Sequence, residues 1–184
     1  TIDFTGVQNM INTNFENTNM SGAILNEANI SGAIFISSIL DHVDFSGTTI
    51  GNVNFSGASM VQITMCGQNL RNAILINTNI SNSDLKNVDF TNQTTLMGSN
   101  FTSSNLTDSI FDNANLSGVN FSGSILHNIE FNKVSVLDNS VYAHSSLDNS
   151  VFRNKILNDL DFTGVISMKN TDFENANLYG IIIN

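Results

Sequence analysis

The residue types that most often perform chemistry in proteins are few in this sequence and lie far apart. It contains three histidines, His42, His127 and His144, and a single cysteine, Cys66. A zinc site needs three or four His, Cys or carboxylate ligands at close spacing, and a catalytic nucleophile needs a neighbouring base. None of the histidines has such a cluster around it in sequence, and Cys66 has no histidine nearby. The sequence therefore predicts no catalytic, cofactor or metal site, and a protein that is not an enzyme.

The chain is acidic overall. Its 184 residues include 16 acidic and six basic side chains, which gives a formal net charge of −10 at pH 7. This sign repels the phosphates of nucleic acids and of anionic lipids, so we expect no direct nucleic-acid binding and no membrane contact. A single cysteine excludes an internal disulfide, and no apolar run reaches the roughly 18 residues of a membrane span. With no recognisable signal peptide, we expect a cytoplasmic protein.

A large apolar residue, which we call a centre, returns at every fifth position along most of the chain. In the stretch FDNANLSGVNFSGSIL, residues 111–126, phenylalanine and leucine alternate at this spacing. The sequence predicts 36 centres from Phe4 to Ile183, separated by five residues except at four steps of six. One of these longer steps is expected between Val136 and Tyr142. The extra residues are expected near Val7, Gln93, Asn139 and Val165.

Each five-residue unit has the same pattern around its centre. The residue two before the centre is usually small or β-branched, and the residue two after it is usually Gly or Asn. In an extended segment residues two apart point to the same side, so the small residue and the centre both face inward. Gly and Asn tolerate the positive φ that the third position of a type II turn requires. Each unit therefore predicts a short strand and a tight corner, with Gly118 and Gly123 at two of the corners.

The order of the centres indicates how many units make one coil. When every fourth centre is placed in one column, aromatic and leucine residues separate into different columns. One aromatic column contains Phe90, Phe111, Phe131, Phe152 and Phe173, the other contains Phe101, Phe121, Tyr142 and Phe162, and Val136 lies in a column of leucines. We expect square coils about 4.8 Å apart with stacked rings, and about nine coils in a rod roughly 43 Å long. The main alternative, a triangular left-handed β-helix, needs a six-residue repeat.

The repeated unit resembles that of the pentapeptide-repeat family. The segments Ala114–Gly118 (ANLSG) and Ala176–Gly180 (ANLYG) carry the resemblance, which extends over the whole chain. It implies an all-β fold, a right-handed quadrilateral β-helix, which we expect to form a single domain over residues 1–184. It also implies a non-catalytic protein-interaction scaffold whose partner the sequence does not name.

The resemblance offers an alternative function as well. The best-understood family members are acidic, rod-shaped DNA mimics that bind DNA gyrase and protect it from quinolones. This chain shares the rod and the sign of the charge, but it has no insertion longer than one residue, whereas long loops matter for protection in the plasmid-borne members. The face with the most acidic residues belongs to the column from Phe4 to Met168. Its candidate contact residues are Glu27, Asp44, Asp84, Asp108 and Asp148.

The C-terminal coil is expected to be the interface of a homodimer. An open solenoid leaves unpaired strand edges at its ends, and these associate unless they are capped. The residues expected at this interface are Leu178, Tyr179, Ile181, Ile182 and Ile183. The less apolar N-terminal end ranks second. The alternative is a last strand that frays without a partner.

Four large side chains break the pattern of small inward residues. They are Gln8, Gln68, Lys155 and Leu160. A long polar side chain in an inward position predicts a local widening of the coil, with the polar tip reaching out through a corner. A functional kink at these positions is the alternative.

Overall fold

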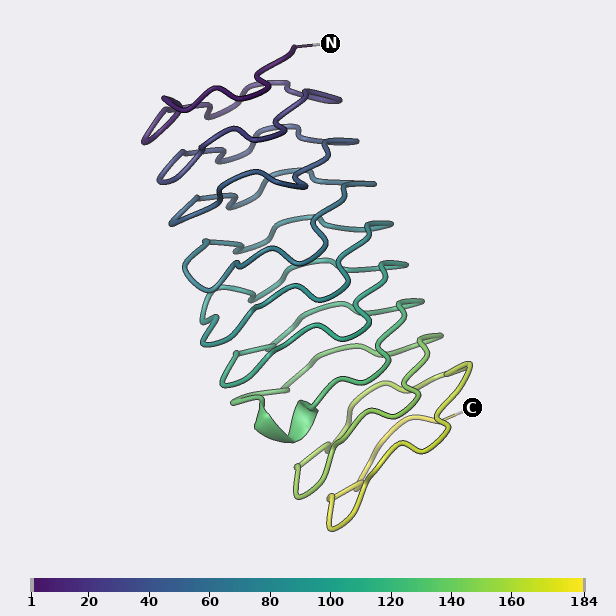
Figure 1. The fold of residues 1–184 in the computed structure, drawn as a ribbon. Helices are drawn as coiled ribbons and strands as arrows, with labels where there is room; N and C mark the ends of the chain where they lie inside the picture. Colours follow the sequence, from purple (N-terminus) through teal and green to yellow (C-terminus); the bar gives the residue numbers. More distant parts are fainter. Residues whose placement is uncertain (1, 184) are drawn as a thin grey trace.

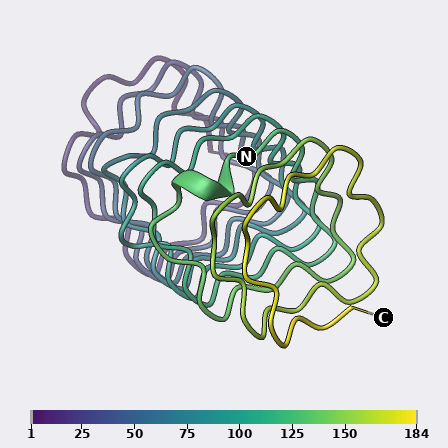
Figure 2. The same ribbon diagram turned by 90° about the horizontal axis from the view of Figure 1, so that it is seen from below.

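The chain winds into a rod of stacked coils. The computed structural model describes residues 2–183, and the two ends of the chain lie at opposite ends of the rod (Figure 1). Seen obliquely from below, successive coils repeat a similar outline, each displaced a little from the one before (Figure 2). Every β-bridge is parallel and joins residues one coil apart, as Asp44 joins Thr64 and Val141 joins Asp161. Because four five-residue units separate the paired residues, the predicted four-sided coil is confirmed.

Regular secondary structure is sparse because each side of a coil is so short. The pairings are isolated bridges rather than long strands. Within residues 2–183 the helical structure is confined to the 3₁₀ helix η1, Phe131–Lys133, which bulges from the stack in Figure 1. Hydrogen bonds between successive coils, such as Leu116 N–H to the Val136 carbonyl at 2.9 Å, hold the sides together.

The core consists of the inward columns, and the aromatic ones stack as predicted over most of their length. Phe101, Phe121, Tyr142 and Phe162 stack with centroid separations between 5.1 and 5.6 Å. Rings of the two aromatic columns meet edge to face across the core, as Phe90 meets Phe101 at 5.7 Å and 85°. These offset and edge-on arrangements are the ones that aromatic rings favour.

The prediction for one six-residue step was wrong. The structure makes Leu137 the centre, with 5% of its surface exposed, while Val136 takes the outward position before it and pairs with Asn115. The extra residue therefore lies just after Phe131, where η1 takes it up, and not after Val136. With Leu137 as the centre, the column contains six successive leucines. They are Leu75, Leu96, Leu116, Leu137, Leu157 and Leu178.

The same bulge interrupts an aromatic column. Phe111 stacks on Phe90 at 4.8 Å, and Phe131 stacks on Phe152 at 4.4 Å. Among the ring pairs of the described chain, Phe111 and Phe131 form no stacked pair. The expectation of an unbroken stack through Phe131 was thus wrong, because η1 shifts the chain at this residue.

The predicted corners are confirmed. Eleven of the 12 glycines have positive φ, as do 22 other residues, most of them Asn. Gly118 has φ of 66°. At Gly164 space also restricts the position to glycine, because a Cβ there would lie 2.5 Å from Nδ1 of His144 in the preceding coil. Two corners lack the positive φ, those at Asn72 and Lys133.

Asparagine has a second role in these corners. The Asn115 side-chain oxygen accepts a hydrogen bond from the Ser117 N–H at 2.9 Å, which forms an Asx turn at the start of the corner. The same bond recurs along the rod, for example from Thr5 to Asp3 and from Tyr179 to Asn177. This local bond satisfies a backbone donor that the neighbouring coil does not reach, which gives a physical reason for asparagine at the position just before a centre.

Candidate interaction surfaces

The acidic face is the side of the rod whose centres run from Phe4 to Met168. Its bridges continue from coil to coil, from Asp3 to Ser167, so this side is regular along the whole rod. Outward positions of the face hold Asp44, Asp84 and Asp148. The remaining candidates, Glu27 and Asp108, lie at its corners with φ near 60°. The structure thus places all five predicted residues along one side of the molecule.

Hydrogen bonds hold most of these carboxylates in place. Asp44 accepts from the Ser46 N–H at 2.8 Å, and Asp108 accepts from the Asn128 side-chain amide at 2.7 Å. Asp148 accepts from the Ser167 hydroxyl and from the Lys169 N–H. The hydrogen bond from Ser167 lowers the pKa of the Asp148 carboxyl, because it stabilises the charged form.

One member of the face is neutralised. Asp84 forms an ion pair with Lys86 at 3.1 Å, while its other carboxylate oxygen is buried and makes no hydrogen bond to the described residues. In the described chain the remaining four, Glu27, Asp44, Asp108 and Asp148, form no ion pair.

The positive charges are confined to the second part of the chain. Residues 1–70 contain five acidic residues and no lysine or arginine, and the first basic residue is Arg71. The ion pairs of the described residues accordingly lie between Arg71 and Glu174. This asymmetry is visible in the sequence, but a count of charge by column does not reveal it.

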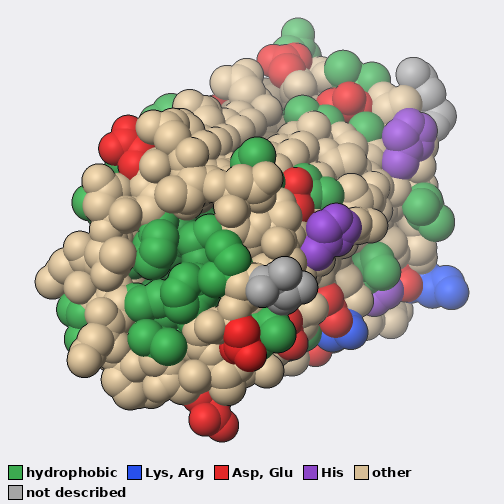
Figure 3. All heavy atoms as spheres, turned by 90° about the horizontal axis from the view of Figure 1, so that it is seen from above, with side chains coloured by type: hydrophobic (Ala, Val, Ile, Leu, Met, Phe, Trp, Pro, Cys, Tyr) green, Lys and Arg blue, Asp and Glu red, His purple; other side chains and the backbone are tan. Residues whose placement is uncertain are grey.

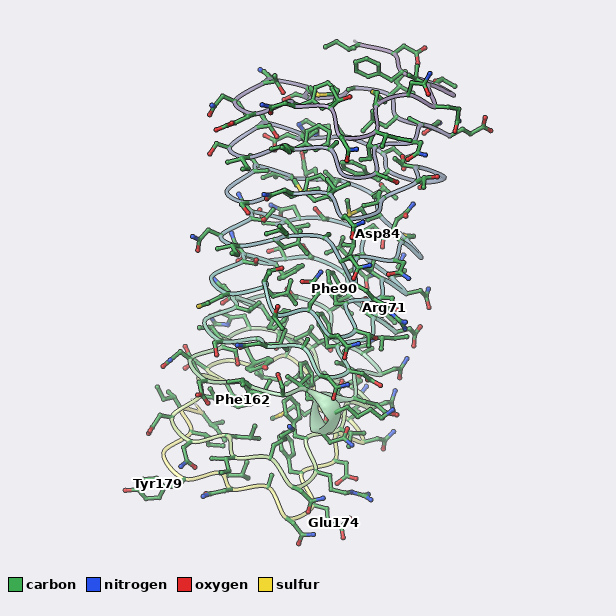
Figure 4. The ribbon with its side chains drawn as sticks, turned by 90° about the vertical axis from the view of Figure 1, so that its left-hand side faces the viewer. Arg71, Asp84, Phe90, Phe162, Glu174 and Tyr179 are labelled. Carbon is green, nitrogen blue, oxygen red and sulfur yellow. The ribbon has the colours of Figure 1, made fainter. Side chains whose placement is uncertain are left out.

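The C-terminal end of the rod is apolar and exposed. Tyr179 is 77% exposed, Ile183 59% and Ile182 47%, and Tyr179 projects outward from the last coil in Figure 4. An apolar hollow of about 70 Å³ opens at this end between Leu178, Ile181 and other core residues. The N–H groups of Phe173 and Leu178 make no hydrogen bond within residues 2–183. Apolar side chains and free backbone donors are thus exposed together at this end of the described rod.

The N-terminal end is also apolar at its centre, as Figure 3 shows. Its centres are better covered than those at the other end: Met10 and Met20 are buried, and Phe4 and Phe15 are partly buried. The last coil leaves Met168, Leu178 and Ile183 exposed. The larger apolar exposure is therefore at the C-terminal end.

The histidines and the cysteine remain apart in the structure. His127 Nε2 lies 2.8 Å from the Ser146 hydroxyl on the acidic face, and the His144 ring lies beside Gly164. Cys66 is exposed, and partial burial of its sulfur and the nearby Asp84 carboxylate raise the pKa of its thiol.

Across residues 2–183 no three His, Cys, Asp or Glu side chains lie close enough to hold a metal ion. Within the same residues no helix is long and apolar enough to span a membrane.

The inward polar side chains bond to the backbone. The Gln68 side-chain amide donates to the Phe45 carbonyl at 2.8 Å, and Lys155 donates to the Val134 carbonyl. Serines and threonines in the same inward position do likewise, as Thr78 does to the Phe55 carbonyl. Inward polar side chains therefore donate hydrogen bonds to backbone carbonyl groups at or beside the corners.

Comparison with known families matches two parts of the chain. A model described as pentapeptide repeats (9 copies) matches residues 15–61, and a model described as pentapeptide repeat region matches residues 68–140. The chain belongs to the pentapeptide-repeat family. Its fold is that of the family, a right-handed quadrilateral β-helix, as the resemblance in the sequence implied.

Solved structures of other pentapeptide-repeat proteins resemble this one. HetL, a protein involved in heterocyst differentiation regulation in the cyanobacterium Nostoc sp. strain PCC 7120, is 16% identical with a TM-score of 0.63. The match covers 99% of this chain and 89% of HetL. QnrB1, a plasmid-mediated fluoroquinolone resistance protein, is 15% identical with a TM-score of 0.44, covering 100% of this chain and 92% of QnrB1. No curated protein sequence matches this chain.

Proposed function

We propose that this pentapeptide-repeat protein is a non-catalytic scaffold that binds other proteins, and that it does so as a homodimer in the cytoplasm. The observation that carries the proposal is the apolar C-terminal end, where Tyr179, Ile182 and Ile183 are exposed together. Large exposed apolar patches on a protein mark surfaces that bind other molecules. The sides of the rod are in contrast closed by hydrogen bonds and corners over most of their length.

A second copy of the chain suits this end. Two-fold symmetry brings the same patch of each subunit together, so apolar centres such as Leu178 and Ile183 would be covered by their own counterparts. The unpaired backbone groups of the last coil would also come together there, as free strand edges do in edge-to-edge association. The dimer would then be a longer rod that exposes two acidic faces to a partner.

Sedimentation equilibrium tests the dimer. We expect the intact protein to be dimeric and the double variant Tyr179→Lys, Ile182→Lys to be monomeric, because two charges would be buried without partners at the interface. Ile11→Lys is the matched control, since Ile11 is a half-exposed isoleucine near the other end. A monomeric intact protein, or a double variant that stays dimeric, contradicts the proposal.

Binding to DNA gyrase is a second candidate, favoured by the acidic face. Four of its five carboxylates form no ion pair in the described chain, and their negative charge along one side of a rod has the sign and shape that would mimic duplex DNA. Electrostatic complementarity of this kind favours partners with basic surfaces, and its effect decreases with salt. The family resemblance supports the same partner.

A supercoiling assay with purified gyrase tests this candidate. The protein should inhibit supercoiling at micromolar concentration, and added salt should relieve the inhibition. The triple variant Glu27→Gln, Asp44→Asn, Asp148→Asn removes three charges and keeps the hydrogen-bond acceptors, so it should inhibit less. The control is Asp138→Asn, Asp159→Asn, which changes acidic residues off this face. Equal inhibition by both variants, or no inhibition by the protein, would exclude the acidic face as a gyrase-binding surface.

A further inference from the structure

The ladder of bridges is open on one side of the rod next to η1. Val136 pairs with Asn115 in the coil before it, and Ile156 pairs with Asn177 in the coil after it, but Val136 and Ile156 form no bridge with each other in the described chain. The N–H groups of Leu137 and Ile156, which would bond across this step, donate to no residue among 2–183. In regular coils the equivalent amides, such as that of Leu157, bond to the next coil at 2.9 Å. Two backbone donors at this step therefore have no acceptor among the described residues.

The gap is a groove of about 380 Å³. It is lined by residues 135–138 and 154–156 and lies beside the bulge that Figure 1 shows at η1. Val136 and Leu137 form an apolar part of the wall, and Ile156, which is 70% exposed, forms its rim. The groove thus combines an apolar surface with free backbone donors.

Lys155 brings a positive charge to the groove. It occupies an inward position that usually holds a small residue, it is partly buried, and its ammonium donates a hydrogen bond to the Val134 carbonyl. Burial lowers the pKa of the Lys155 ammonium. Lys86, Lys133 and both arginines have carboxylate partners, whereas no carboxylate in the described chain forms an ion pair with Lys155. A partly buried cation without a counter-ion is costly, and a bound anion would remove that cost.

We propose that the Lys155 groove, formed by residues 135–138 and 154–156, binds a carboxylate that carries an adjacent apolar group. The ammonium of Lys155 and the N–H groups of Leu137 and Ile156 would hold the carboxylate by charge-assisted hydrogen bonds. The apolar group would lie against Val136 and Ile156. Asp138, at the exposed rim, disfavours ligands of higher negative charge, so a single carboxylate fits better than a phosphate.

Two sources offer this chemistry: the C-terminal residue of a peptide and a small organic acid. A peptide terminus would make the groove a second partner site of the scaffold, separate from the apolar C-terminal end. The inference does not depend on the dimer, because the groove lies on the side of the rod and is complete within one chain.

Nuclear magnetic resonance titration of ¹⁵N-labelled protein tests the proposal. The probes are N-acetyl-leucine, its amide N-acetyl-leucinamide, hexanoate and inorganic phosphate, and the readout is the shift of the Leu137 and Ile156 amide signals. We expect N-acetyl-leucine to shift both signals saturably. N-acetyl-leucinamide should bind about tenfold more weakly or worse, because the loss of a charge-assisted hydrogen bond changes affinity by at least that factor. Hexanoate binding as well as N-acetyl-leucine supports an organic acid, and weaker hexanoate binding supports a peptide terminus.

Matched variants separate the groove from the rest of the surface. Lys155→Met keeps the length of the side chain and should weaken N-acetyl-leucine binding about tenfold or more, whereas Lys169→Met, which removes an exposed lysine, should leave it unchanged. Ile156→Ser removes the apolar rim without changing the core, and it provides a second test should Lys155→Met not fold. Equal binding of acid and amide, equal binding of phosphate and acid, or unchanged binding in Lys155→Met or Ile156→Ser would overturn the proposal.

Discussion

At the residue scale, the corners explain why so few residue types fill this sequence. Each corner requires a positive φ, which Gly adopts freely and Asn adopts at low cost, whereas a β-branched side chain there clashes with its own backbone. Gly118 has φ of 66°, and the nearest atom to a Cβ placed on it is 3.9 Å away. Space is therefore not the limit at this position, and the backbone conformation alone decides what is tolerated.

Substitution of Gly118 tests this directly. Gly118→Val should lower the free energy of unfolding by roughly 2 kcal/mol or more, and Gly118→Asn by about 1 kcal/mol or less, because they differ in tolerance of positive φ. Urea denaturation of both variants provides the measurement. Similar midpoints for Val and Asn would contradict the corner assignment.

The Asx turns give the asparagines a measurable effect on stability. Asn115→Ala removes the acceptor of the Ser117 N–H and should lower the free energy of unfolding by roughly 0.5–1.5 kcal/mol. From the sequence alone, Asn115 reads as a neutral surface residue. The matched control is Asn158→Ala, since the exposed Asn158 side chain makes no hydrogen bond in the described chain. Equal unfolding midpoints in urea would show that the turn bond adds nothing.

At the scale of elements, η1 is the main irregularity of the rod. It absorbs the extra residue after Phe131, interrupts the stack between Phe111 and Phe131, and is followed by the open step at Lys155. The ring of Phe131 nevertheless stays fully buried, stacked on Phe152 and edge-on to Tyr142 at 5.5 Å. The core is continuous past the bulge, although the surface is not.

The loss of stability in Phe131→Ala tests whether the core is tightly packed at η1. Phe131→Ala should lower the free energy of unfolding by roughly 3–5 kcal/mol, because it leaves a cavity in a column that cannot collapse. Phe4→Ala, which removes a partly buried ring with a single edge contact at 6.4 Å, should cost clearly less. Thermal or urea unfolding compares the two. A Phe131 variant as stable as the Phe4 variant would mean that the bulge has already loosened the column.

At the scale of the whole molecule, the carboxylates that bond across or within coils make stability depend on pH. Hydrogen bonds to the charged form lower the pKa of Asp148, Asp161 and Asp172, with donors that include the Ser167 hydroxyl and the Thr163 and Glu174 amides. A carboxyl with a lowered folded pKa binds protons more readily in the unfolded chain. Its contribution is therefore present above the ordinary aspartate pKa of 3.8, which applies in the unfolded chain, and is lost as the pH falls through the lower pKa of the folded state.

Denaturation at several pH values tests this sign. The free energy of unfolding should fall as the pH is lowered from about 5 to 3, and the fall should be smaller in Asp148→Asn, which keeps the acceptor oxygen and loses the titration. Comparison of the two proteins removes the effect of overall charge, which changes almost equally in both. An identical slope in both would contradict the proposed role of the Asp148 hydrogen bonds.

The sequence by itself determined the four-sided coil, the inward columns and the corners. Each five-residue unit has a single way to bury Phe or Leu and to place Gly or Asn at positive φ, so local chemistry leaves little choice. The position of the extra residue near Phe131 was decided only by tertiary structure. Val136 and Leu137 are both apolar. The chain from Phe131 to Tyr142 must contain one step of five residues and one of six, and the sequence pattern permits either order, with Val136 or with Leu137 as the centre. In the folded structure Leu137 is the buried residue, and it continues the leucine column of the core.

The tertiary structure likewise decided what the outliers do. In the sequence Lys155 is a long polar residue in a small inward position, which predicts a widening but no ligand. The groove follows η1 in the chain, at a step where the amides of Leu137 and Ile156 have no partners among the described residues and Lys155 reaches the Val134 carbonyl. A pairing between coils depends on residues about 20 positions apart that must align in space, and a repeat pattern does not encode where that alignment fails.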